Sequence, residues 1–204
     1  SINIVEVTWK AKLKQAFPNP SAYSAFMGQF SSVTGLVTLC AMIFGRFALN
    51  KWGWGPSALI TPVVLLVTGG AFFGFILAGD AISPLVAALG TTPLFLAVVF
   101  GAAQNVLSKA AKYSLFDPCK EMAYIPLDSE AKTKGKAAIE VVGAPLGKSG
   151  GSLIQQVLIF SFGSLAASTP YLAGFLAIII GAWIVAARSL SQQFNDKMAA
   201  QMND

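Results

Sequence analysis

Long apolar runs alternate with short polar segments along the whole chain. Four runs carry no charged residue, and they cover residues 18–45, 53–79, 91–108 and 169–187. Each approaches or exceeds the roughly 20 residues that a helix needs to cross a bilayer. A fifth segment, residues 136–163, is long enough to cross but includes Glu140 and Lys148. The pattern predicts an all-α, polytopic membrane helix bundle.

The composition supports this class. Of 204 residues, 55% are hydrophobic and 11% are charged, and the mean hydropathy is +0.65. The charged fraction is about half that of a soluble domain. The net charge of +5 comes from basic residues placed between apolar runs, so we interpret them as loop charges that set orientation rather than as a nucleic-acid surface. With no His and two Cys, the sequence offers no disulfide framework, zinc-ligand spacing or imidazole base.

Polar chemistry is concentrated in residues 109–156, which hold seven of the fourteen Lys and Arg. Within it, we expect residues 109–135 to form a polar loop with one short amphipathic helix. Asp117 and Pro118 read as the N-cap and first position of that helix, which either covers the bundle or acts as a gate. Two membrane helices follow over residues 136–188, and residues 189–204 are expected to be a polar tail.

Lys148 is the most unusual residue of the fifth segment. As a helix from residue 136, the segment places Lys148 about 18 Å from its start, near the bilayer midplane. An ammonium there costs at least about 2.5 kcal/mol unless it faces protein or water. Gly143, Gly147 and Gly151 form a stripe that favours close approach of another helix. A buried lysine beside open glycine backbone suits an anion. GAPLGKS is one residue too short for a P-loop and lacks its α/β surroundings.

Three further polar residues lie inside apolar segments. Residues 1–14 resemble the end of a membrane helix, in which Glu6 would need a cationic partner or a substrate. The alternative is a solvent-facing glutamate at a frayed helix end. Gln104 and Asn105 either hydrogen-bond to a neighbouring helix or line a cavity, and the sequence favours neither.

Several motifs carry a resemblance to a known family. They are KYSLFDPCKEMAYIPLD at 112–128, KGKAA at 134–138, GKSGG at 147–151, VEVTWK at 5–10 and FGSLA at 162–166. The chain resembles the ATP/ADP translocases of plastids and of obligate intracellular bacteria such as chlamydiae and rickettsiae. The resemblance implies a twelve-helix protein of major-facilitator type, with this chain as roughly its C-terminal half. It also implies transport roles for Glu6 and Lys148, and Cys119 favours the plastid branch.

The sequence and the resemblance together predict a transporter rather than an enzyme: antiport of ATP for ADP by alternating access, without covalent chemistry or cofactor. The expected substrate-binding residues are Lys148, Glu6, Gly147 and Ser149, with Glu140, Asn105 and Gln104 as secondary candidates. The expected partners are ATP, ADP, the lipid bilayer and an N-terminal half of the same transporter. The expected location is the plastid inner envelope, or alternatively a bacterial inner membrane. A second hypothesis is a half-transporter kept as a structural subunit of a larger membrane complex, which nucleotide binding would disfavour.

Overall fold

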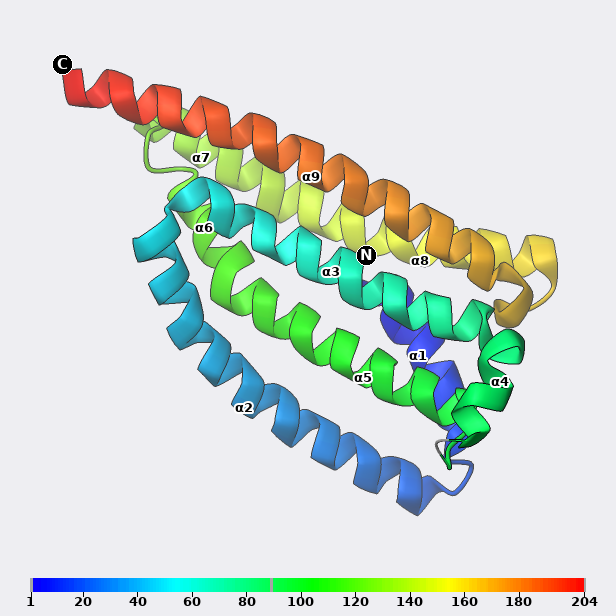
Figure 1. Cartoon of the computed structure of the whole chain (residues 1–204). Helices are drawn as coiled ribbons and strands as arrows, with labels where there is room; N and C mark the ends of the chain where they lie inside the picture. The colour runs from blue at the N-terminus through cyan, green and yellow to red at the C-terminus, as the bar shows by residue number, and fades with distance from the viewer. Residues whose placement is uncertain (1, 89, 204) are drawn as a thin grey trace.

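The computed structural model describes residues 2–88 and 90–203, and every regular element in these residues is a helix (Figure 1). In chain order the elements are α1 (Ile2–Ala16), α2 (Pro20–Trp52), α3 (Trp54–Leu77), α4 (Gly79–Ala88), α5 (Pro93–Ala111), η1 (Lys112–Phe116), α6 (Asp117–Met122), α7 (Ser129–Ala137), η2 (Ala138–Gly143), α8 (Ala144–Phe162) and α9 (Leu165–Asn203). The elements η1 and η2 are π-helical turns.

Local sequence signals set the helix ends. The side chain of Asn19 accepts a hydrogen bond from the amide two residues on (2.8 Å), and Thr92 accepts one from the amide three residues on (3.2 Å). A proline follows each cap, where its missing N–H costs nothing. Gly53 separates α2 from α3 and Gly163 ends α8, with φ of 76° and 75°, a region that glycine enters without strain.

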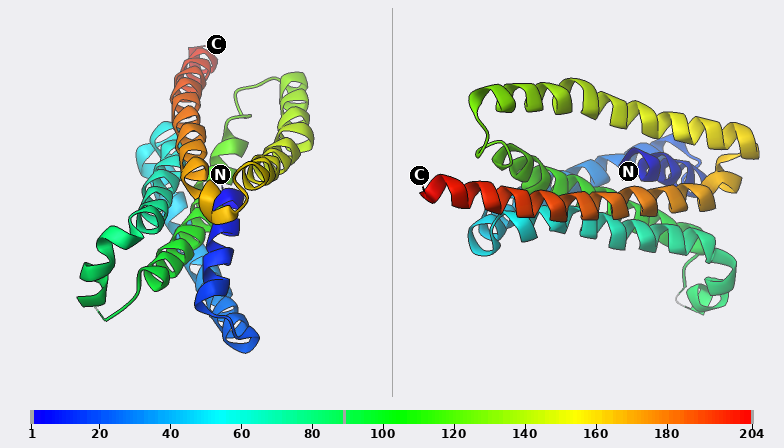
Figure 2. Two further views of the ribbon diagram at one scale, coloured as in Figure 1. Left: turned by 90° about the vertical axis from the view of Figure 1, so that its right-hand side faces the viewer. Right: turned by 90° about the horizontal axis from the view of Figure 1, so that it is seen from above.

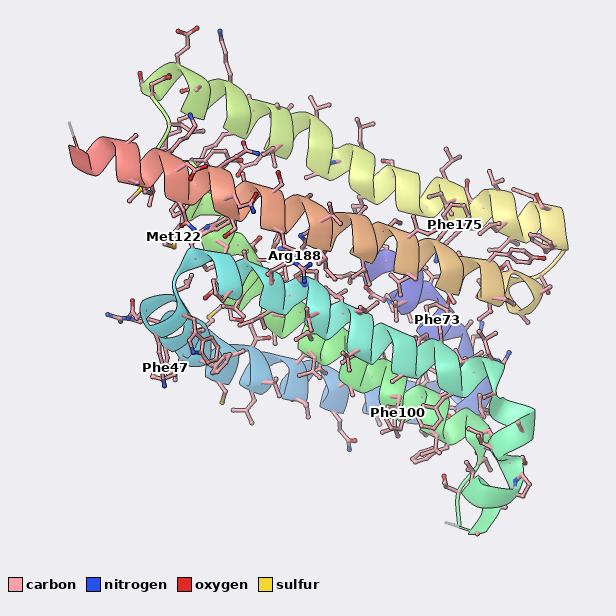
Figure 3. The ribbon with its side chains drawn as sticks, turned by 45° about the horizontal axis from the view of Figure 1, so that its top comes forward. Phe47, Phe73, Phe100, Met122, Phe175 and Arg188 are labelled. Atoms are coloured by element: carbon pink, nitrogen blue, oxygen red, sulfur yellow. The ribbon has the colours of Figure 1, made fainter. Side chains whose placement is uncertain are left out.

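Four helices of the described residues are long and apolar enough to cross a membrane: Pro20–Trp52, Trp54–Leu77, Pro93–Met122 and Leu165–Ala200. They confirm the predicted all-α membrane bundle. Large apolar side chains cover its outer surface, and Phe47, Phe100 and Phe175 point outward from α2, α5 and α9 (Figure 3). The helix α8 is not among the four, because Lys148 and its glycine, serine and glutamine residues lower its hydropathy.

The third span does not end at residue 108, where the sequence analysis placed the start of a polar loop. The chain stays helical from α5 through η1 into α6, so Lys109 lies inside a helix. Asp117 has helical torsions and caps no amide; its carboxylate pairs with the ammonium of Lys112 (2.9 Å). The π turn explains the difference. It shifts the hydrogen-bond register just before Pro118, which lacks an N–H.

Two other boundaries differ from expectation. The predicted polar tail continues α9 as helix to Asn203, and the short helix α4 was not anticipated. Both segments lie at ends of the bundle (Figure 1). No sequence rule marks either boundary.

The core forms around α5, which packs on α1, α2 and α3, while α3 also packs on α9. Trp9 of α1 is fully buried, and its indole N–H donates to the carbonyl of Val98 in α5 (2.9 Å). Its ring also lies 4.7 Å from that of Phe30 in α2. Gly101 allows this approach, because a side chain there would collide with the rings of Trp9 and Phe72.

The helices α7, η2 and α8 form one long arm alongside α9 (Figure 2). In the C-terminal half of the arm, Gln155 donates a hydrogen bond to the carbonyl of Ile4 in α1 (3.2 Å). Gln155 is the one buried residue of α8, all of whose residues are described. The arm therefore offers most of its surface to something other than the described part of this chain.

Candidate functional site

Lys148 lies one turn into α8, with its side chain exposed. It lines a hollow of about 600 Å³ together with Ser149 and five other residues, all of them from α8. The sequence analysis expected Lys148 to be buried. The structure places it on an open helix surface instead, because none of the described helices covers this part of α8. A hollow lined by one helix is one wall of a site rather than a closed pocket.

Gly147 belongs to the same surface. A Cβ built on Gly147, Gly150 or Gly151 would meet no atom within 4 Å, and one on Gly143 would meet only its own helix. The glycine stripe therefore packs against no other described helix, contrary to the simplest expectation. It leaves the backbone beside Lys148 and Ser149 open to an approaching ligand or to another part of the protein.

Glu6 is held by a neighbour on its own helix. Its carboxylate lies 2.9 Å from the ammonium of Lys10, one turn along α1. The structure therefore pairs Glu6 with Lys10, whereas the sequence left open whether Glu6 meets a cationic partner, a substrate or solvent. The i,i+4 spacing within a helix brings two such side chains together without any tertiary contact, so the local partner wins. The carbonyl of Ile4, two residues before Glu6, receives the hydrogen bond of Gln155, so α8 contacts this part of α1.

Glu140 lies at the other end of the arm, in η2. Its carboxylate accepts from the ammonium of Lys120 in α6 (3.0 Å), and Lys136 pairs with Glu121 of α6 (2.6 Å). These pairs fasten α6 to the arm. The eight residues from Glu140 to Lys148 rise about 12 Å along a helix, so the structure does not bring Glu140 to the Lys148 hollow.

Gln104 and Asn105 point into the core. Both are fully buried in α5. Asn105 donates to the carbonyl of Gly101 (2.8 Å), while both polar atoms of the Gln104 side chain and the carbonyl oxygen of Asn105 have no described partner. Neither residue lines any of the described hollows around Lys148 or Lys109. Buried unpaired amides are costly, so these two need an explanation of their own.

Sequence reasoning missed Lys109, which it assigned to a loop. In the structure Lys109 is half-buried on α5 and lines a second hollow with hydroxyl residues of α2. One signal could have found it. No residue from Ala110 to Phe116 is a helix breaker, so the helix could be expected to continue past Lys109 and on to Met122.

The family model described as TLC ATP/ADP transporter matches residues 1–194, nearly the whole chain. The chain belongs to this family. Its resemblance to the translocases of plastids and intracellular bacteria is thereby confirmed.

Named relatives agree with the family model. The chain is 64% identical to the chloroplastic ADP,ATP carrier protein 1 of Arabidopsis thaliana over 96% of its length and 31% of that protein. It is 60% identical to the plastidic ATP/ADP-transporter of Solanum tuberosum, covering 95% and 31%. It is 57% identical to ADP,ATP carrier protein 1 of Chlamydia trachomatis, covering 98% and 38%. The chain thus spans about a third of the length of these relatives. No solved structure matches it.

Proposed function

We propose that this chain forms one half of a membrane antiporter that exchanges ATP for ADP by alternating access. The observation that carries the proposal is the open wall of α8, where Lys148 has no carboxylate partner among the described residues. Its family membership and the names of its relatives support nucleotides as the cargo. Such a carrier needs ATP and ADP as substrates and no cofactor.

The chemistry of the wall suits a nucleotide phosphate. Fourteen residues separate Lys148 from the end of α8 at Phe162, which places the ammonium about 21 Å from that end of the helix, close to the middle of a bilayer. At that depth an ammonium without an anion is costly, and a phosphate is its strongest available partner. Gly147 and Ser149 add open backbone and a hydroxyl. Transport then needs no bond to form or break.

Glu6 has a supporting role in this proposal. When the site is empty, the carboxylate of Glu6 balances the charge of the Lys10 ammonium. When a nucleotide enters beside α1, release of Lys10 from Glu6 gives the phosphates a further cation. The second wall comes from an N-terminal half of the same transporter, and rocking of the two halves would expose the site to each side in turn. The plastid inner envelope is the membrane that the plastid relatives favour, and a bacterial inner membrane is the alternative.

Replacing Lys148 tests the proposal in the complete transporter that contains this chain. Lys148→Gln should lower ATP/ADP exchange by about 100-fold or more in proteoliposomes, because a charged hydrogen bond to phosphate is lost along with the membrane-buried counter-charge. Lys132→Gln is the matched control, since Lys132 is an exposed lysine on α7 without an ion pair. Glu6→Gln should slow exchange as well. Exchange near the wild-type rate in Lys148→Gln, with the protein inserted and folded, would refute the role of Lys148.

A further inference from the structure

A second hollow lies between α2 and the end of α5. It has a volume of about 490 Å³, and its lining includes Lys109, Tyr113, Ser31, Thr34 and Thr38. One ammonium and four hydroxyl groups therefore surround it. Thr34 donates its hydroxyl proton to the carbonyl of Phe30 (2.6 Å), while no hydrogen bond of the described structure involves the hydroxyls of Ser31, Thr38 or Tyr113.

The ammonium of Lys109 has no carboxylate partner among the described residues. It lies 5.5 Å from the centre of the Phe30 ring, a weak cation–π contact. Three residues further on, Lys112 is compensated by Asp117 at 2.9 Å. Lys109 is thus a half-buried cation left open toward the hollow.

Its depth makes this unusual. Lys109 comes sixteen residues after Pro93 in a span that continues to Met122, so it lies about 24 Å along a helix of about 44 Å. Thr34 lies about 21 Å from the start of α2, and Lys148 about 21 Å from the end of α8. The start of α5, the start of α2 and the end of α8 all lie at the same end of the bundle, the right-hand end in Figure 1. Lys109, Thr34 and Lys148 therefore stand at about the same depth.

Other cations without a carboxylate partner lie at other distances from this end of the bundle, including Lys132 on α7 and Lys197 in the last two turns of α9. Lys12 and Lys14 are within about 6 Å of the end of α1, whereas Arg46 and Lys51 are about 39 Å or more along α2. Arg188 is about 35 Å along α9. Within the described part of the chain, Lys109 and Lys148 are thus the unpaired cations at mid-depth.

The helices α2 and α8, which line the two hollows, both contact α1. On α2, Phe30 touches Trp9 of α1, and Thr34 and Thr38 follow one and two turns further along. On α8, Gln155 touches Ile4, and Lys148 lies two turns away on the same face, toward α7. Figure 2 shows α1 between α8 and α2. The helix α8, which carries Lys148, and the helix α2, which lines the hollow of Lys109, therefore lie on either side of α1.

We propose that Lys109, with Tyr113 and the hydroxyls of Ser31 and Thr38, is a second phosphate-binding station of the transport path, in addition to Lys148. This inference rests on the proposed function, since the ligand is the polyphosphate chain of the transported nucleotide. An ammonium and hydroxyl donors match phosphate oxygens. A lipid headgroup has the same chemistry, and competition with a lipid distinguishes the two ligands in the test below.

Binding of inorganic tripolyphosphate and of ATP to the complete transporter in detergent tests the proposal. Lys109→Gln and Lys109→Met should each weaken both ligands by about ten- to hundredfold, the value of one charged hydrogen bond. Methionine keeps an apolar stem against Phe30, so the Met variant guards against a simple loss of packing. The thermal midpoint of the ligand-free protein should stay unchanged, and Lys132→Gln should bind as the wild type does.

Three results would overturn the second station. One is binding within about twofold of wild type in both variants. Another is weakened binding together with a lowered ligand-free midpoint in both, which would show a structural role. The third is displacement of tripolyphosphate by phosphatidylglycerol, which would make the station a lipid site. If instead wild type exchanges no nucleotide, or Lys148→Gln exchanges normally, the proposed function itself fails.

Discussion

The helices α5 and α8 are both 19 residues long, and each carries one of the two lysines discussed above, Lys109 on α5 and Lys148 on α8. Their environments are nevertheless opposite. Nine residues of α5 are buried against α1, α2 and α3, whereas α8 buries Gln155 alone. The difference separates two tasks. α5 holds the bundle together, while α8 presents Lys148, Ser149 and open glycine backbone to an occupant from outside the described chain.

The glycines of α5 and α8 differ in the same way. Gly101 of α5 is needed because the rings of Trp9 and Phe72 occupy the space where a side chain would start. Gly147 of α8 faces open space. A matched pair of alanine substitutions therefore compares a packing glycine with a surface glycine.

The largest effect on stability is expected from that pair. Gly101→Ala should destabilise the protein by about 2–3 kcal/mol, because one methyl group must displace two buried rings. Gly147→Ala should leave stability unchanged or raise it by up to about 1 kcal/mol, the difference in helix propensity. Thermal unfolding midpoints in detergent would measure both.

The same two variants also separate packing from transport. Gly147→Ala should lower ATP/ADP exchange even though the protein stays folded, since the methyl group narrows the surface beside Lys148. Equal midpoints for the two variants would contradict the assignment of α5 to packing and α8 to binding.

The sequence predicted the helices well because lipid imposes a simple requirement, an apolar run of sufficient length. It failed at Lys109 because a count of uncharged residues ends a span at its first lysine, whereas the helix hydrogen bonds continue through it. The depth of Lys148 followed from helix length alone. Its exposure did not, because exposure depends on which other helices lie nearby.

Long-range contacts were also beyond the sequence. The bond from Trp9 to the carbonyl of Val98 joins residues 89 positions apart, and no local pattern announces it. The pair of Glu6 with Lys10 is different, because its i,i+4 spacing is a local pattern that the sequence already contains. Family resemblance supplied the expected roles of Glu6 and Lys148, which periodicity could not supply and which remain predictions.

A second, smaller change in stability should come from Gln104. Its amide is buried in α5 with both polar atoms unpaired. Gln104→Leu replaces the amide with an apolar group of similar size and should stabilise the protein by about 1–2 kcal/mol, the cost of an unpaired buried polar group. Exchange should persist if α5 only packs. A lower midpoint, or a loss of exchange in a stable variant, would return Gln104 to the substrate path.

The smallest effect is expected where α6 meets the arm. Lys120 and Glu140 are partly exposed, and such pairs contribute about 0–1 kcal/mol. Glu140→Gln should therefore lower the thermal midpoint only slightly, and by less at high salt, where the charges of the remaining network are screened. If the Lys120–Glu140 pair holds the N-terminal end of α8 in place during transport, Glu140→Gln should affect exchange more than stability.

The swapped variant Lys120→Glu with Glu140→Lys restores the opposite charges and serves as the control, although Lys136 and Glu121 also lie in this network. Recovery of exchange in the swap would support a fastening role. Unchanged exchange in Glu140→Gln alone would show that the arm is held instead by its contacts with α9 and α1, such as the hydrogen bond of Gln155 to Ile4.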